Sequence, residues 1–73
     1  MPRRLKLSPL QRDITMMLEE AGAETVGTVI ATLKPSDLDE FTAQVEGLVS
    51  LGLILKEENN LVLTEQGRIA LGT

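Results

Sequence analysis

The sequence predicts a mainly helical α+β domain, in which three helices are followed by a β-hairpin and a short last helix. Residues 48–68, LVSLGLILKEENNLVLTEQGR, read as a helix end, a Gly-marked stop, two short apolar strands around a polar turn, and a new helix start. Three segments before this run carry apolar residues at helical spacing. The 73 residues are enough for one domain with one small core. We expect that domain over residues 8–73, preceded by a flexible basic arm over residues 1–7.

The first helix is expected to begin after Ser8, whose side chain suits an N-cap. Pro9 fits the first helical position, and Gln11 stands where a capping box takes Glu or Gln. Gly22 is placed to end the helix, because glycine readily adopts the left-handed conformation found there. Apolar residues between these signals recur at i, i+4, i+7 and i+8 and form one face: Leu10, Ile14, Met17 and Leu18.

The second helix is expected over residues 25–33 and the third over residues 36–51. Pro35 separates them, because the residue before a proline avoids the α region. Ser36 or Asp37 is expected to cap the third helix, and Gly52 to end it. The apolar stripe expected to face the core from the second helix is Val26, Val29, Ile30 and Leu33. The corresponding stripe of the third helix is Leu38, Phe41, Val45, Leu48 and Val49.

The hairpin strands are expected over residues 53–56 and 61–64, joined by the polar turn at residues 57–60. Side chains alternate along a strand, so Leu53 and Leu55 are predicted on one face. Ile54 and Val62 are then predicted to point to the opposite, outer face. Thr64 is expected to cap the last helix.

The charge balance argues against strong nucleic-acid binding by the isolated domain. The chain has 7 Lys and Arg residues against 11 Asp and Glu residues, a formal net charge of −4, whereas nucleic-acid-binding domains usually carry a basic patch. Phe41 is the single aromatic residue, which disfavours stacking of unpaired bases on aromatic platforms. Arg3, Arg4 and Lys6 make the arm basic. The arm is either a minor-groove contact, as in homeodomains, or a solubilising tail.

The composition gives no support for catalysis. The chain lacks His, Cys, Tyr and Trp, and its glycines are scattered instead of gathered in a phosphate-binding loop. Adjacent carboxylates such as Glu19 and Glu20 fall on predicted surface, and neighbouring helical residues do not face each other. We predict that the protein is not an enzyme and uses no cofactor, metal or small-molecule substrate. No apolar run approaches the roughly 20 residues that span a bilayer, so we expect no membrane partner and a cytoplasmic location.

The predicted order and two short strings resemble the winged helix-turn-helix superfamily of prokaryotic transcription regulators. LVSLGLI, residues 48–54, is similar to its L-x-x-x-G-L-I junction between helix and wing. LVLTEQGR, residues 61–68, is similar to its L-T-x-x-G-R junction between wing and helix. The resemblance extends over residues 8–71. It implies that the second and third helices form a helix-turn-helix, that the third helix enters the major groove, and that the hairpin is the wing. It also implies action as a homodimer on duplex DNA.

The same resemblance implies which residues contact DNA, and here the chain departs from the family. The expected contacts are Arg3, Arg4, Lys6, Thr42, Gln44 and Lys56. Thr42 and Gln44 are otherwise part of a solvated helix face. Recognition helices usually carry Arg, Lys, Asn or Gln for bases and phosphates, but the third helix has no Lys or Arg. Asp39 and Glu40 in its first turn suit the helix dipole, yet they repel phosphates.

The acidic third helix therefore leaves two functions open. One is a non-enzymatic module resembling DNA-binding transcription regulators, with weak or partner-dependent DNA contact. The alternative is a protein–protein interaction module that uses an acidic surface and binds no DNA. The residues expected on that interaction surface are Asp39, Glu40, Glu46, Ile54 and Val62. The two apolar members, Ile54 and Val62, otherwise rest on the arm or on the last helix.

Overall fold

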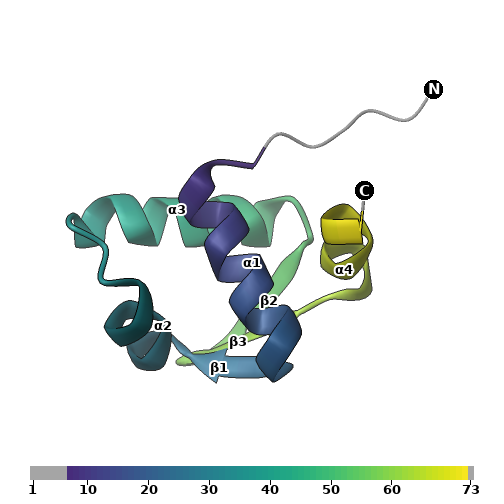
Figure 1. The fold of residues 1–73 in the computed structure, drawn as a ribbon, viewed down its shortest axis with the longest axis horizontal. Helices are drawn as coiled ribbons and strands as arrows, with labels where there is room; N and C mark the ends of the chain where they lie inside the picture. Colours follow the sequence, from purple (N-terminus) through teal and green to yellow (C-terminus); the bar gives the residue numbers. More distant parts are fainter. Residues whose placement is uncertain (1–6, 73) are drawn as a thin grey trace.

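A computed structural model describes residues 7–72 as a layer of helices packed on a small antiparallel sheet (Figure 1). The elements in chain order are α1 (Pro9–Ala21), β1 (Ala23–Thr25), α2 (Val26–Leu33), α3 (Leu38–Ser50), β2 (Ile54–Glu57), β3 (Asn60–Leu63) and α4 (Glu65–Gly72). The α+β class and the predicted order are confirmed. The described residues hold one strand more than predicted, β1, and four helices, of which α4 stands in the place of the short last helix. The predictions for Arg3, Arg4 and Lys6 lie outside the described residues.

Helix α1 begins as its sequence predicts. Ser8 and Gln11 form a complete capping box: the Ser8 Oγ accepts from the Gln11 backbone N–H at 3.1 Å, and the Gln11 Oε1 accepts from the Ser8 N–H at 3.0 Å. Gly22 follows the last turn with a φ of 85°, a value that favours glycine. Leu7, which was expected in the arm, is half-buried against the core. The packed domain therefore includes Leu7.

The sheet has the strand order β1-β3-β2, with both pairings antiparallel. Strands β2 and β3 are joined by a two-residue turn, Glu58 and Asn59, in place of the four-residue turn expected. Glu58, the first residue of this turn, has a positive φ of 56°. β2 consequently begins one residue later than predicted, at Ile54, which pairs with Leu63.

The predicted faces of β2 are reversed, because Leu53, which was expected to be the first core-facing residue of the strand, lies in the junction before it. Ile54 is 0 % exposed, whereas Leu55 is 53 % exposed and pairs with Val62 on the outer face. The prediction that Ile54 lies on the outer face is therefore wrong. Leu53 is also buried, because it belongs to the α3–β2 junction, where its N–H donates to the Leu48 carbonyl at 3.0 Å.

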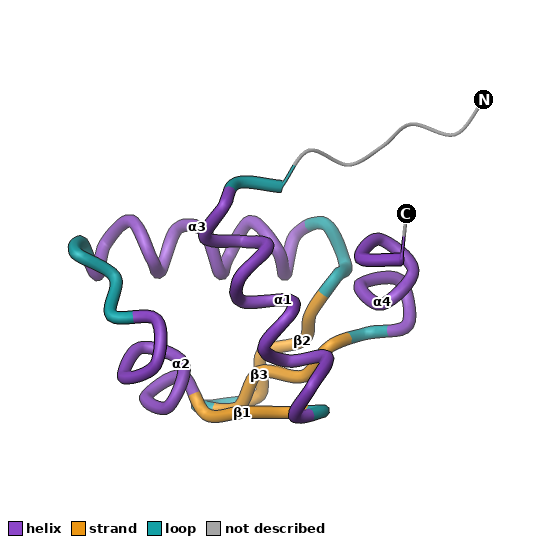
Figure 2. The backbone as a smooth tube through the Cα atoms, viewed as in Figure 1, coloured by secondary structure: helices purple, strands orange, loops and turns teal. Residues whose placement is uncertain are grey.

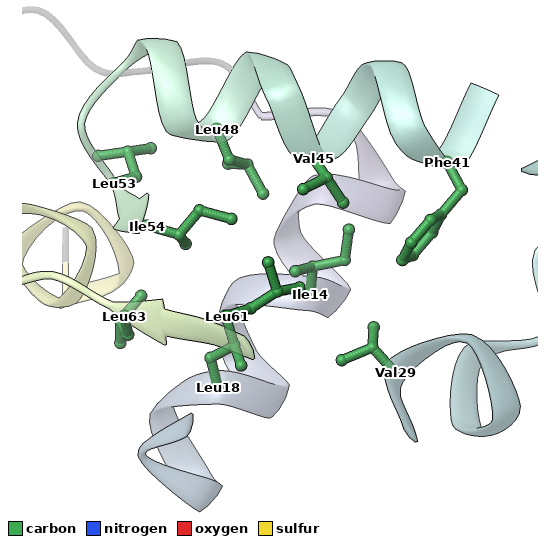
Figure 3. Packing of buried hydrophobic residues seen from close by; sticks show 10 residues of the cluster. All are labelled: Ile14, Leu18, Val29, Phe41, Val45, Leu48, Leu53, Ile54, Leu61 and Leu63. Carbon is green, nitrogen blue, oxygen red and sulfur yellow. The ribbon is translucent and has the colours of Figure 1, made fainter. Parts of the chain in front are cut away.

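One hydrophobic core joins all the layers, and α1 crosses it (Figure 3). Ile14 and Leu18 of α1 are fully buried, and α1 contacts α2, α3, α4, β1 and β3. Phe41 points from α3 toward Val29 of α2. The remaining members come from α3, the hairpin and the α3–β2 junction: Val45, Leu48, Leu53, Ile54, Leu61 and Leu63.

A compact junction ties the base of the hairpin to α4. The Thr64 hydroxyl donates to the carbonyl oxygens of Gly52 and Leu53 at 2.7 and 2.8 Å, and it accepts from the Gly67 N–H at 3.0 Å. Gly67 is buried, and a Cβ there would collide with the Leu53 carbonyl oxygen and lie 2.6 Å from Leu63 Cδ1. The predicted capping role of Thr64 is confirmed, and the glycine three residues later is required by close packing.

Replacing Phe41 with alanine tests the position of α3 in the core. Phe41 is 2 % exposed, so Phe41→Ala should lower the free energy of unfolding by about 3–5 kcal/mol. Leu38→Ala, one turn earlier at a side chain 56 % exposed, is the matched control and should change it by less than about 1 kcal/mol. Chemical denaturation measures both. Equal losses would contradict this packing of α3.

Two glycine-to-alanine changes test the α4 junction. Gly67→Ala should lower the free energy of unfolding by about 1–3 kcal/mol, because the new methyl group overpacks the contact with Leu53. Gly27→Ala in α2 is the control. A Cβ at Gly27 meets nothing within 4 Å, so this variant should gain about 0.4–1 kcal/mol from helix propensity and a more restricted unfolded chain. Thermal melts measure both variants. If both were more stable than the parent protein, the close packing of Gly67 against Leu53 would be contradicted.

Candidate binding surface on helix α3

Helices α2 and α3 follow one another directly and are joined by residues 34–37 (Figure 2). Thr25 caps α2 by accepting from the Thr28 N–H at 3.2 Å. Lys34 ends α2 in the left-handed conformation, with a φ of 50°. Asp37 then starts α3, because its Oδ1 accepts from the Asp39 and Glu40 N–H groups at 2.9 and 3.2 Å. The prediction that Ser36 or Asp37 caps α3 is thus resolved in favour of Asp37.

The face of α3 that points away from the core is acidic. Asp39, Thr42 and Glu46 are exposed along it, and no Lys or Arg occurs anywhere in the helix. Asp39 and Glu40 lie in the first turn, where carboxylates interact favourably with the helix dipole. This arrangement stabilises α3, but it gives the helix no cation with which to meet a phosphate.

Gln44, predicted to contact DNA, faces α1 instead. Its Oε1 accepts from the Ser8 hydroxyl at 2.8 Å, and its Nε2 donates to Glu40 at 2.8 Å. The Gln44 backbone carbonyl also accepts from the Gln11 side chain at 3.3 Å. Gln44 therefore fastens α3 to the start of α1, Glu40 holds the Gln44 side chain from within α3, and Gly47 leaves space for Gln11. In this structure neither side chain belongs to the surface that carries Thr42 and Glu46.

An open hollow lies between α2, α3 and the hairpin. It brings together three of the predicted site residues, Thr42, Glu46 and Lys56, although Lys56 is ten or more residues from the others in sequence. Its apolar lining consists of Val26, Phe41 and Val45. The fold thus places a small apolar recess, with one charged group of each sign, beside the outer face of α3.

Two side chains next to this hollow are more exposed than the sequence suggested. Leu38 and Val49 were predicted to face the core, but they are 56 % and 36 % exposed. The reason is that α3 buries only a narrow edge, centred on Phe41, Val45 and Leu48. The helical pattern alone did not show where this buried edge ends.

The predicted interaction residues do not form one surface. Ile54 is in the core, so it is unavailable for contact. Val62 is partly buried on the outer face of the sheet, next to the exposed Leu55 and Ala23. Lys56 pairs with Leu61 and so lies on the opposite face of the sheet. Asp39 and Glu46 share α3, but Val62 is separate from them.

The described domain is more acidic than the whole chain. All eleven carboxylates lie in residues 7–72, against four of the seven cations: Arg12, Lys34, Lys56 and Arg68. The hairpin turn adds the exposed Glu57 and Glu58 beside Lys56. Within these residues, no group of three or more acidic side chains is arranged to hold a metal ion. None of the described helices has both the length and the apolar character needed to cross a bilayer.

Comparison of the chain with protein-family models, curated proteins and solved structures finds no match.

Replacing Gln44 tests whether it fastens α3 to α1. Gln44→Ala removes two side-chain hydrogen bonds and should lower the free energy of unfolding by about 0.5–1.5 kcal/mol. Thr42→Ala, on the exposed face of the same helix, is the control and should change it by no more than about 0.5 kcal/mol. Urea denaturation followed by circular dichroism measures both. A neutral Gln44→Ala would show that the contact with Ser8 contributes nothing to stability.

Proposed function

We propose that this chain is a non-enzymatic winged-helix module of the transcription-regulator type, with weak or partner-dependent contact to duplex DNA. The observation that carries the proposal is the helix–turn–helix unit of α2 and α3, joined by four residues and followed by a β-hairpin. In helix-turn-helix proteins the second helix of such a unit lies in the major groove. Within residues 7–72 the outer face of α3 is exposed, and Thr42 lies on it.

The charge of α3 sets the strength of this contact. Phosphate contacts from Lys and Arg supply most of non-specific DNA binding, and α3 has neither. The cations left for phosphates are Lys56 on the hairpin and the arm residues Arg3, Arg4 and Lys6. We expect the isolated domain to bind duplex DNA at physiological salt with a Kd of roughly 10⁻⁴ M or weaker. A module of this type would act in the cytoplasm, with homodimer formation adding a second set of contacts.

A second candidate function is protein binding through the acidic surface without DNA. Leu38 and Val49 favour it, because two exposed aliphatic side chains on α3 gain little from a DNA phosphate backbone. Exposed apolar side chains that share one flank of a helix favour protein contacts over phosphate contacts.

A titration of the ¹⁵N-labelled chain with random and AT-rich duplex DNA tests the first function. At low salt, amide shifts should gather on Thr42, Lys56 and Arg3/Arg4, and they should weaken as salt rises. Gln44 should shift less than Thr42, because its side chain is bonded to Ser8. Absence of shifts at low salt would rule out DNA contact, and sub-micromolar sequence-specific binding would rule out the weak affinity expected here.

The double variant Arg3/Arg4→Ala separates phosphate contact from other binding. If both arginines meet phosphates, the slope of log K against log salt should flatten by about 2, since each lost contact removes about 0.9. Arg12→Ala is the control, because it also replaces an arginine with alanine, but at an exposed position on α1 outside the arm. An unchanged slope in the arm variant would exclude the arm from DNA contact.

A further inference from the structure

We propose that the apolar flank of α3 is the docking site for an amphipathic helix of a partner protein, with aliphatic side chains on one face and Lys or Arg beside them. The site consists of Leu38, the hollow at Thr42 and Val45, and Val49. This inference deepens the protein-binding function proposed above and rests on it. It names where the partner binds and what chemistry the partner presents.

The spacing along α3 is the first part of the argument. Leu38, Thr42, Val45 and Val49 stand at i, i+4, i+7 and i+11, so they share one flank of the helix. The exposed aliphatic ends, Leu38 and Val49, are about 16 Å apart at a helical rise of 1.5 Å per residue. That distance equals three turns of a second helix. A partner helix with aliphatic residues at the same spacing can therefore touch both ends and the recess between them, as in helix-in-groove recognition.

The hollow provides the recess at the centre of this stripe. Its lining of Val26, Phe41 and Val45 is apolar. The ends of Phe41 and Val45 turn toward the core, and both are nearly fully buried. Docking an aliphatic side chain over them removes further apolar surface from water without disturbing the fold. Side chains that fill a central pocket usually carry most of the affinity of an interface.

Charge complementarity identifies the partner as cationic. Glu46 and Lys56 give the hollow one charge of each sign. The surrounding excess is negative, from Asp39 on α3 and Glu58 on the hairpin turn, both exposed. Lys or Arg flanking the aliphatic face of a partner helix would meet these carboxylates, whereas acidic helices and DNA phosphates would be repelled. Aliphatic side chains exposed among carboxylates thus suit a basic amphipathic helix better than a duplex.

The test is a titration of the full chain with a synthetic 15-residue peptide. The peptide has Leu at i, i+4, i+7 and i+11 and Lys or Ala elsewhere. One control peptide has the same composition with the leucines scattered around the helix, and a second has Glu in place of Lys. Fluorescence anisotropy gives the Kd, and amide shifts give the site. Only the first peptide should bind saturably, with shifts on Leu38, Thr42, Val45, Val49 and Lys56.

Variants of the protein assign the binding to α3. Leu38→Ser and Val49→Ser should each weaken binding by about fivefold or more, the factor that corresponds to a hot-spot loss of about 1 kcal/mol. Met16→Ser is the matched control, because Met16 is 52 % exposed on α1 and should leave the Kd unchanged. Glu46→Gln should weaken binding at low salt, whereas Glu19→Gln on α1 should not. Circular dichroism checks that every variant is folded.

Several outcomes would overturn the proposal. Equal binding of the scattered-leucine peptide would reduce the effect to charge, and no saturable binding of the first peptide would remove the site. Shifts gathered on Leu55 and Val62 would locate protein binding on the outer sheet face, leaving the protein-binding function intact while overturning this site.

A dimer that dissociates in Leu38→Ser would make a second copy the occupant. If a peptide of residues 1–7 gave the same shifts and competed, the occupant would be the chain's own arm. Salt-sensitive shifts of the same stripe with duplex DNA, and none with peptide, would assign the face to DNA.

Discussion

The fold depends on the burial of one face of α1. Ile14 and Leu18 occupy the centre of a core of ten buried apolar side chains, and the helix contacts α2, α3, α4 and two strands. A domain of this size has little other apolar surface to bury, and the chain has no cysteine for a disulfide. Every other element except β2 therefore packs against α1, and β2 is held through β3 and α3. Fully burying one such side chain contributes about 1.5–3 kcal/mol, so one lost contact in this core removes a large part of the stability.

This constraint also determines which part of α3 is free. One edge of the helix is committed to the core through Phe41, Val45 and Leu48, and a second edge is bonded to the start of α1 through Gln44. What is left is the flank from Leu38 to Val49 and the acidic outer face. These remaining residues determine which chemistry a ligand can meet, because the Gln44 side chain is already hydrogen-bonded to Ser8 and Glu40.

Local signals predicted the ends of elements well. Ser8, Gln11, Asp37 and Thr64 each bond to nearby backbone groups, and such short-range bonds depend on a few neighbouring residues.

Strand β1 was missed because its three residues are too few to show alternation, and its pairing with β3 joins segments far apart in sequence. The faces of β2 were reversed because Leu53 was expected to be part of the strand, whereas the strand begins at Ile54 and Leu53 is buried in the junction before it. The roles of Gln44, Leu38 and Val49 were missed for a related reason: a helical pattern does not reveal which neighbour packs beside each flank. Of the expected site residues within the described part, the fold brings Thr42, Glu46 and Lys56 to one hollow.

The contact of Gly67 with the Leu53 carbonyl has a consequence for motion. Leu53 is hydrogen-bonded through its N–H to Leu48 at the end of α3 and through its carbonyl to the N–H of Thr64, immediately after β3. Displacing α4 would expose this carbonyl and break the three-way bonding of the Thr64 hydroxyl, so the last helix and the hairpin should open together as one cooperative unit. Amide protons at the base of the hairpin would then exchange with solvent at the rate set by detachment of α4. A ligand that holds α4 in place would slow that exchange at a distance.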